Sequence, residues 1–388
     1  MVHAGEVAYD PFRKDLDRDP YPVWRRLRDE APVYRNDEHD FYALSRFDDV
    51  LAALTDPDTF RSGYGNLLEL MSDEPLGLPY LVMLDDPGHR AHRALTSRAF
   101  TPRRVAALEE HVRRLCAELL DAQIGSGGFD FIQDFAALVP SQVISELIGV
   151  EKADRERVRR LIDQSLHVES GAGIVNDVAV QAQSELRQCY IRLIEARRDD
   201  PRDDLATALS QVGLGTEEAA CFVAELVGAG TETTAKLLGW ACLLLDEHPD
   251  QRARLAGDPA AIGNAVEETL RFQAPSPVQG RRVATDVRLH GTVIPAMSKV
   301  LLLNGSANRD EREFADADCY DVTRHIDRHL AFGYGIHHCL GAALARLEAR
   351  IALQEMLARF PEWEVDRRQV VPSHTSTVRG HHRIPIAV

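Results

Sequence analysis

One segment near the carboxyl end of the chain limits its possible folds more than any other. It reads Phe-Gly-Tyr-Gly-Ile-His-His-Cys-Leu-Gly over residues 332–341, and an apolar helical pattern follows over residues 342–350. Its three glycines allow a tight, irregular turn whose backbone N–H groups can point at a single sulfur atom. The following helix presents its positive end to that sulfur, and both effects favour a thiolate at Cys339.

A thiolate held in this way suits a soft metal, above all haem iron. The segment follows the pattern F-G-x-G-x-H-x-C-x-G, and it resembles the haem-ligand loop of the cytochrome P450 family. The resemblance implies haem b as cofactor, Cys339 as its axial metal ligand, O2 as co-substrate, and Phe332, Gly335 and His337 as cofactor-binding residues. Other interpretations are a buried cysteine that only packs, or a zinc site that includes His338. Buried structural cysteines are inert, and the cluster lacks a complete zinc ligand set.

Helical periodicity dominates the rest of the chain. The longest predicted helix spans Thr216–Glu247, another spans residues 340–359, and a strand-rich stretch spans residues 282–303. Because no linker, repeat or low-complexity tract interrupts the chain, we predict one haem-thiolate monooxygenase domain over residues 1–388. The predicted fold class is mainly α with small β-sheets (α+β). The resemblance places the haem between the long central helix and the C-terminal helix.

The middle of the long predicted helix carries the run G-A-G-T-E-T-T at residues 228–234. A glycine costs about 1 kcal/mol in a helix interior, so this pair indicates that a group approaches the backbone closely or that the helix is locally opened. Thr233 can donate to a carbonyl one turn back, and Glu232 supplies a titratable group. The run resembles the family's A/G-G-x-D/E-T pattern. That likeness implies Glu232 and Thr233 as catalytic residues that deliver protons, with Ala229 and Gly230 at the cofactor. The plainer alternative is a glycine-kinked core helix with a solvated glutamate.

A protein that binds haem needs cations or hydrogen-bond donors beside the propionate groups. His89 and Arg93 are spaced i, i+4 and resemble the outer positions of the family's H-x-R-x-R segment. Arg282 matches the arginine that opens a strand under the propionates. Arg281 is the alternative, because the local spacing is one residue short of the family's pattern. His337, two residues before the cysteine, is the third source.

A second pattern of the family has a structural role. Glu268 and Arg271 match its E-x-x-R helix, which is expected to tie that helix to the irregular segment over residues 304–329. Here the sequence departs from the pattern, because Cys319 stands where many members have an arginine partner. Arg324, His325 or backbone groups are the candidates to complete the pair.

Charge and cysteine usage bear on location and partners. The formal net charge of −16 argues against nucleic acid, because phosphate binding needs a basic footprint. None of the six cysteines forms a C-x-x-C pair, so we expect reduced thiols and a cytoplasmic protein. The sequence has no leader-like segment and no apolar run of ~20 residues, so we expect no membrane anchor.

The resemblance implies a haem-dependent monooxygenase that inserts one atom of O2 into a small-molecule substrate, by C–H hydroxylation or a similar oxidation. We expect an apolar pocket and a lipophilic substrate, roofed by residues 63–82, closed by a lid at residues 166–175, and walled by Leu226, Val278 and residues 376–378.

Electrons are expected from an external ferredoxin and ferredoxin reductase, because the chain lacks a dinucleotide fingerprint. Six arginines are candidates for ferredoxin docking, although they could equally be ordinary solvated side chains: Arg93, Arg98, Arg103, Arg104, Arg346 and Arg350. We expect a monomer. The alternatives are a peroxide-driven haem oxidase, disfavoured by the acid–alcohol pair, and a non-catalytic haem-binding gas or redox sensor, in which a proton relay would be pointless.

Overall fold

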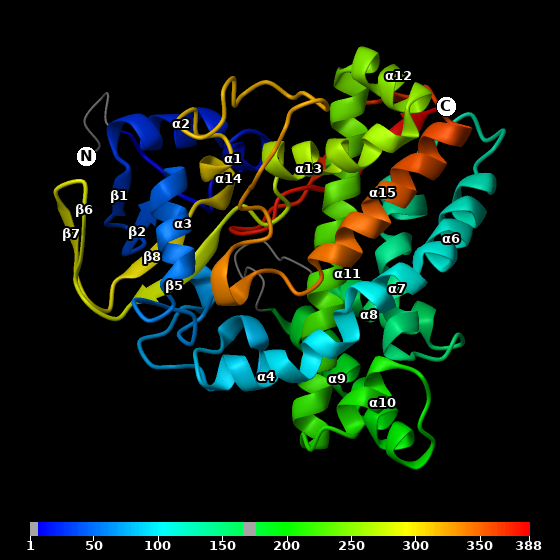
Figure 1. Cartoon of the computed structure of the whole chain (residues 1–388), viewed down its shortest axis with the longest axis horizontal. Helices are drawn as coiled ribbons and strands as arrows, with labels where there is room; N and C mark the ends of the chain where they lie inside the picture. Colours follow the sequence, from blue (N-terminus) through cyan, green and yellow to red (C-terminus); the bar gives the residue numbers. More distant parts are fainter. Residues whose placement is uncertain (1–6, 166–175) are drawn as a thin grey trace.

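The computed structural model describes residues 7–165 and 176–388 (Figure 1). Most of the helices lie on one side of the molecule, and most of the strands lie on the other together with a few helices, which confirms the predicted mainly α class with small sheets. The helices are α1 (Asp15–Arg18), α2 (Tyr21–Glu30), α3 (Phe47–Thr55), α4 (Gly88–Thr96), α5 (Pro102–Ala107), α6 (Glu109–Asp121), α7 (Leu138–Ile148), α8 (Arg155–Ser165), α9 (Asp177–Asp199), α10 (Leu205–Ser210), α11 (Thr216–Glu247), α12 (Pro249–Gly257), α13 (Ile262–Phe272), α14 (Asn304–Ala307) and α15 (Ala342–Arg359).

The strands are short and belong to four small sheets. They are β1 (Val33–Asn36), β2 (Phe41–Leu44), β3 (Phe60–Arg61), β4 (Phe129–Asp130), β5 (Gln279–Val283), β6 (Val287–Leu289), β7 (Thr292–Ile294), β8 (Lys299–Leu302), β9 (Glu364–Val365), β10 (Val371–Pro372), β11 (His381–Arg383) and β12 (Pro385–Ala387). Two single turns of 3₁₀ helix also matter for the site, namely η2 (Leu81–Met83) and η6 (Gly335–His337).

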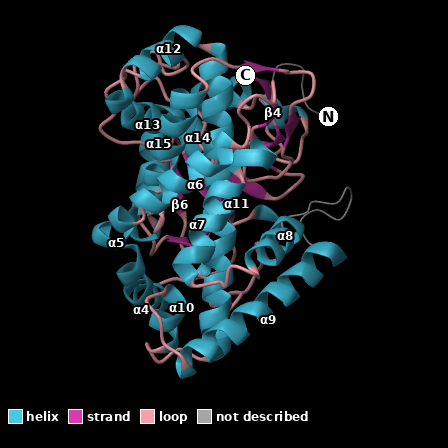
Figure 2. Ribbon diagram, turned by 90° about the vertical axis from the view of Figure 1, so that its right-hand side faces the viewer, coloured by secondary structure: helices cyan, strands magenta, loops and turns pink. Residues whose placement is uncertain are grey.

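Helix α11 runs through the middle of the molecule (Figure 2). It has the bounds that the sequence predicts, and its 32 residues span about 48 Å. Two glutamates in its first turn, Glu217 and Glu218, interact favourably with the positive end of the helix. The helix packs against α7, α9 and α15, so it is covered by other helices along much of its length.

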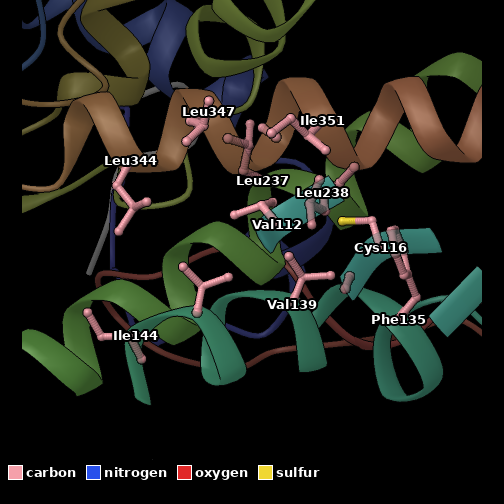
Figure 3. Packing of buried hydrophobic residues seen from close by; sticks show 14 of the residues in the cluster. Val112, Cys116, Phe135, Val139, Ile144, Leu237, Leu238, Leu344, Leu347 and Ile351 are labelled. Atoms are coloured by element: carbon pink, nitrogen blue, oxygen red, sulfur yellow. The ribbon is translucent and has the colours of Figure 1, made fainter. Parts of the chain in front are cut away.

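The main apolar core lies where α6, α7, α11 and α15 meet (Figure 3). Each fully buried leucine or isoleucine there contributes about 1.5–3 kcal/mol relative to an exposed one. Burial also raises the pKa of the Cys116 thiol well above its usual value, so this cysteine packs as a small apolar side chain. Figure 3 shows side chains of this core, including Val112, Cys116, Val139, Leu237, Leu238, Leu344, Leu347 and Ile351.

The largest sheet joins segments that are far apart in the sequence. Its strand order is β1-β2-β8-β5-β3, in which β2 and β8 run parallel and the other neighbours run antiparallel. Side chains alternate between the two faces of a strand. In β5, Gln279 and Arg281 therefore share one face, and Arg282 lies on the opposite face.

The irregular segment and the lengths of the apolar helices can also be compared with what the sequence predicts. The segment over residues 304–329 contains the short α14 and otherwise turns and irregular backbone, as expected. Within residues 7–165 and 176–388, no helix is both long enough and apolar enough to cross a membrane.

Candidate active site

An internal cavity lies between α11 and the loop that carries Cys339. The volume that the centre of a water molecule can occupy in this cavity is about 270 Å³. Its walls come from α11, α15, the segment over residues 331–341 and η2, and most of its lining side chains are apolar. The sequence therefore brings the cysteine segment and the glycine-containing helix run to one enclosed space.

The backbone of the cysteine loop needs its glycines. Gly333 and Gly335 have φ angles of 65° and 68°, in the left-handed region that favours glycine. A side chain at Gly335 would also collide with the carbonyl oxygen of Leu54. The turn closes when the Cys339 N–H donates to the Phe332 carbonyl at 2.9 Å. This geometry agrees with the tight turn that the sequence predicts.

The Cys339 sulfur receives the donors that the sequence predicts. Backbone N–H groups of Gly341 and Ala342 donate to it, and the positive charges of Arg93 and Arg346 lie near. Burial nevertheless dominates and raises the pKa of the thiol. The side chain has accessible surface, but that surface faces the cavity. A coordinating metal ion would favour the thiolate at this position.

Gly230 of α11 lines the cavity and leaves open space there. A Cβ atom at Gly230 would meet only the Ile144 side chain, at 3.9 Å, whereas Gly228 is not among the described residues that line the cavity. Ala229 is exposed although it lies in the middle of the central helix, because it faces the cavity. The helix is continuous across the run. Of the two explanations, close approach of another group therefore fits Gly230, and a locally opened helix does not fit.

The two residues of the acid–alcohol pair, Glu232 and Thr233, differ in whether they border the cavity. Thr233 lines the cavity, and its Oγ1 donates to the Ala229 carbonyl at 2.7 Å. Glu232 is half-buried and is not among the described residues that line the cavity. Burial raises the pKa of the Glu232 carboxyl, and the positive charge of Lys236, one turn later, opposes this shift. A carboxyl of this kind can take up and release protons nearer to neutral pH than an exposed glutamate.

Two histidines and an arginine gather at one edge of the cysteine loop. The rings of His89 and His337 have centroids 4.3 Å apart, and the Nε2 atom of buried His89 has no hydrogen-bond partner among the described groups. The Nε2 atom of His337 lies 3.1 Å from the Ser62 hydroxyl. Arg93 lines the cavity and donates to the His338 carbonyl at 2.6 Å. A buried nitrogen without a hydrogen-bond partner is unfavourable for stability, so this edge of the cavity is suited to a ligand that offers a hydrogen-bond acceptor.

Of the two kinds of group expected beside the propionates, a cation or a hydrogen-bonding group, His337 is the second. Burial, assisted by the charges of Arg281, His89 and Arg93, lowers the pKa of His337 to about 2. The imidazole is therefore neutral at physiological pH and can act only as a hydrogen-bonding group.

The two candidate arginines of β5 point in opposite directions. Arg282 donates to the carbonyl oxygens of Met297 and Ser72 at 2.8 and 2.7 Å, and to the Asp73 carboxylate at 2.5 Å. Arg281 shares a face with Gln279, which lines the cavity, and its charge acts on His337. The prediction that Arg282, rather than Arg281, binds the cofactor therefore does not fit the side-chain placement. The register of β5 directs the Arg282 side chain away from the cavity.

The residues at this edge fit a propionate-bearing cofactor. Arg93 and Arg281 supply positive charge, whereas His89 and His337 supply neutral hydrogen-bonding nitrogens. Phe332 lines the cavity, and the guanidinium carbon of Arg346 lies 4.4 Å from the centroid of its ring. Together with a sulfur atom that faces an enclosed space, this donor set is suited to haem.

The E-x-x-R pair is completely buried and has a third partner. Arg271 forms an ion pair with Glu268, with donor–acceptor distances of 2.6 and 2.7 Å. Its remaining donors reach the carbonyl oxygens of residues 308, 317 and 319. Arg324 donates to Glu268 at 3.3 Å, and the backbone N–H of Asp321 donates to the same carboxylate at 3.0 Å, so Arg324 and a backbone group together complete the pair. His325 is exposed and pairs with Asp327 instead.

Two carboxyl groups that were not predicted from the sequence also line the cavity. Glu348 of α15 is buried, its Oε2 has no hydrogen-bond partner among the described residues, and burial raises its carboxyl pKa to about 8. Glu225 of α11 accepts hydrogen bonds from the backbone of η2. The only sequence signal for Glu348 is an acid nine residues after Cys339, inside a helix that is otherwise apolar on its buried side.

The predicted pocket walls are confirmed in part. Leu226 lines the cavity, and so do Leu81 and Val82 of the predicted roof. Val278 and Ser376 instead border a separate small hollow beside Trp24. The lid predicted at residues 166–175 lies outside the described residues.

Comparisons with known proteins agree with this geometry. A family model described as Cytochrome P450 matches residues 262–385. A Mycobacterium tuberculosis protein provisionally named cytochrome P450 123 is 44% identical over 395 residues, covering 100% of this chain and 98% of that protein. The 6-deoxyerythronolide B hydroxylase of Saccharopolyspora erythraea is 36% identical, covering 100% and 99%. The solved structure of cytochrome P450 PksS from Bacillus subtilis is similar with a TM-score of 0.90 and 30% identity, covering 98% and 99% of the two chains.

Proposed function

The chain belongs to the cytochrome P450 family, whose members are haem monooxygenases, and we propose that it holds haem b through Cys339 and hydroxylates a lipophilic small molecule. The observation that carries this proposal is the position of the Cys339 sulfur. It faces an enclosed cavity, receives two backbone N–H donors, and lies across that cavity from the open backbone of α11.

We infer the cofactor contacts from the groups at the cavity edge. Cys339 would ligate the iron, while Arg93, Arg281, His89 and His337 would hold the propionates. When bound, haem supplies the site for O2 and the electron chemistry that splits it. The N–H groups after Cys339 stabilise negative charge on the sulfur, and the apolar walls keep bulk water away.

The chain's own groups would manage the protons. Thr233 holds a proton at Oγ1 on the cavity wall. After Thr233 gives up this proton, the neighbouring Glu232 is suited to supply another one, from the side of the helix where Lys236 lies. Glu348 retains its proton at neutral pH because burial raises its carboxyl pKa, so it is a second donor at the cavity. We propose that these groups deliver the protons that oxygen cleavage consumes.

The cavity walls support a lipophilic substrate. Leu81, Val82, Phe100, Ile144 and Leu226 all face the cavity and offer dispersion contacts rather than hydrogen bonds. Hydroxylation as the reaction class is supported by the name of one relative, the 6-deoxyerythronolide B hydroxylase.

We propose an external ferredoxin and ferredoxin reductase as the electron supply. Arg103 is exposed and suited to an acidic partner. Arg346 and Arg350 have acidic partners of their own, Glu267 and Glu109, which reduces the positive charge that they offer. Arg104 contacts Asp203, and the side chain of Arg98 lies outside the described part of the chain.

Domain organisation, oligomeric state and cellular location are proposed as follows. We propose one domain over residues 1–388 and a monomer. A cytoplasmic setting is supported by the cysteines, since all six are unpaired.

The proposed function is tested by following NADH oxidation in the presence of a surrogate ferredoxin and ferredoxin reductase. A monooxygenase should consume NADH much faster when a lipophilic substrate is added, and a hydroxylated product should appear. A haem sensor would bind ligands without forming product. A peroxide-driven oxidase would form product from hydrogen peroxide but not from NADH.

A further inference from the structure

One carboxylate lies among the apolar walls of the cavity, on the side of η2. Glu225 belongs to α11 and lines the cavity together with Leu81 and Val82. Its Oε2 accepts a hydrogen bond from the Leu81 N–H at 2.7 Å, and its Oε1 accepts one from the Val82 N–H at 2.8 Å. The carboxylate is therefore held in one orientation before any ligand enters.

Among the described residues, no cation is paired with this carboxylate. None of the ion pairs among residues 7–165 and 176–388 includes Glu225. His92 is near enough to influence it, but the His92 Nε2 lies 2.9 Å from Glu218. Burial accordingly raises the pKa of the Glu225 carboxyl, and the two backbone donors oppose this shift. A buried charge without a counter-charge is unfavourable, so a cationic ligand would be favoured here.

The carboxylate also has capacity for a further donor. Two carboxylate oxygens offer about four lone-pair positions, and the backbone of η2 uses one on each oxygen. The remaining positions are available on a group that borders the cavity.

We propose that Glu225 is a specificity-determining residue, and that the substrate is a lipophilic amine whose protonated nitrogen binds its carboxylate. This inference rests on the proposed function. Glu225 and Thr233 are separated by eight positions on a continuous helix, which corresponds to about 12 Å along its axis. The oxidised carbon should therefore lie roughly 10–12 Å from the nitrogen, and the substrate should be elongated.

A purely structural role is the competing explanation. The same two hydrogen bonds fasten η2 to α11, so Glu225 could serve only to hold the roof of the cavity. The two roles differ in one respect. A roof clamp should support the binding of charged and neutral ligands alike, whereas an anchor for amines should discriminate between them.

The test compares three ligands with the same alkyl chain, using holoenzyme at pH 7.4 and isothermal titration calorimetry. The ligands are N,N-dimethyldodecylamine, 1-dodecanol and dodecanoate. The wild-type protein should bind the amine about tenfold or more tightly than the alcohol, because charge-assisted hydrogen bonds are the stronger ones, and should bind dodecanoate most weakly. Equal affinities, or tighter binding of dodecanoate or of the alcohol, would overturn the proposal without any variant being needed.

Two variants separate the anchor from the roof clamp. Glu225→Gln should lose the preference for the amine and keep the affinity for 1-dodecanol. The matched control is Glu218→Gln, on the same helix but engaged with His92, which should keep the preference. Equal losses for amine and alcohol in Glu225→Gln would identify a structural clamp and reject the anchor.

Absorption spectra of the same samples locate the nitrogen and check the premise. A shift of the haem band toward shorter wavelength on adding the amine places the chain, not the nitrogen, near the iron, as the proposal requires. A shift toward longer wavelength would mean that the nitrogen binds the iron, which contradicts it. If the carbon monoxide complex shows normal thiolate ligation but the amine has no advantage, only this inference fails. Loss of thiolate ligation would instead undermine the proposed function.

Discussion

At the scale of single residues, the buried carboxyl of Glu348 has the clearest thermodynamic consequence. Burial raises its folded-state pKa to about 8, whereas an unfolded chain leaves it near the ordinary glutamate value. Between these values the folded protein binds more protons than the unfolded one. The stabilisation from protonated Glu348 is therefore fully present below about pH 4.5 and is lost as the pH rises through about 8.

The variant Glu348→Gln should remove this dependence. Because glutamine cannot ionise, the variant should gain stability relative to wild type as the pH rises from 5 to 8.5, by roughly 1–3 kcal/mol. Thermal unfolding midpoints of the two holoproteins across that range measure the effect. A constant difference between them would show that Glu348 ionises normally.

A second prediction concerns the neighbouring arginines of β5. Arg281→Met should release haem about tenfold faster than wild type, because one charge-assisted contact to the propionates is lost. Arg282→Met should have a smaller effect on haem release, since Arg282 is engaged with Met297, Ser72 and Asp73. Transfer of haem to an excess of apomyoglobin measures both rates, and faster loss from the Arg282 variant would reverse the assignment.

At the scale of elements, α11 offers a matched pair of threonines. The hydroxyl groups of Thr231 and Thr233 both donate to carbonyl oxygens one turn back, at 2.8 and 2.7 Å, but only Thr233 is among the described residues that line the cavity. Thr233→Val should lower the product formed per NADH by about tenfold, because a methyl group cannot hold the proton. Thr231→Val should leave this ratio nearly unchanged. Equal ratios for both variants would remove Thr233 from the proton path.

The junction between α13 and the irregular segment is a second feature at this scale. Arg271→Ala leaves buried Glu268 with Arg324 as its one charged partner among the described residues, so it should cost about 3–5 kcal/mol and lower haem retention. Arg324→Ala should cost less, because Arg324 is less buried and lies farther from Glu268. Urea unfolding and haem content after gel filtration measure the two effects. Full haem occupancy in Arg271→Ala would contradict the structural role.

The elements differ in how far the sequence could predict them. The bounds of α11 and the turn at residues 332–341 follow from local signals, namely helical period and glycines at left-handed positions. The direction of Arg281 depends on the register of β5 against β8, which local sequence does not contain. Glu225 and Glu348 resemble solvated helix acids until α11 and α15 enclose the cavity.

At the scale of the whole molecule, burial modifies what the local sequence predicts. Glycines and a following helix supply donors to Cys339, as the sequence indicates, yet enclosure by the fold raises the thiol pKa. Enclosure likewise makes His337 neutral, where the sequence leaves open whether it supplies a positive charge or a hydrogen bond. Pairings between distant segments decide these properties, so the chemistry of the site could be predicted only in outline.

The proposed chemistry depends most on ligation of haem iron by the Cys339 thiolate. The most direct measurement is the carbon monoxide difference spectrum of the dithionite-reduced holoprotein, recorded for the wild type and for Cys339→His. The wild type should show the red-shifted band that gives the cytochrome P450 family its name, and the variant should show the shorter-wavelength band of histidine ligation. A short-wavelength band in freshly prepared wild-type protein, or a red-shifted band in the variant, would contradict the account.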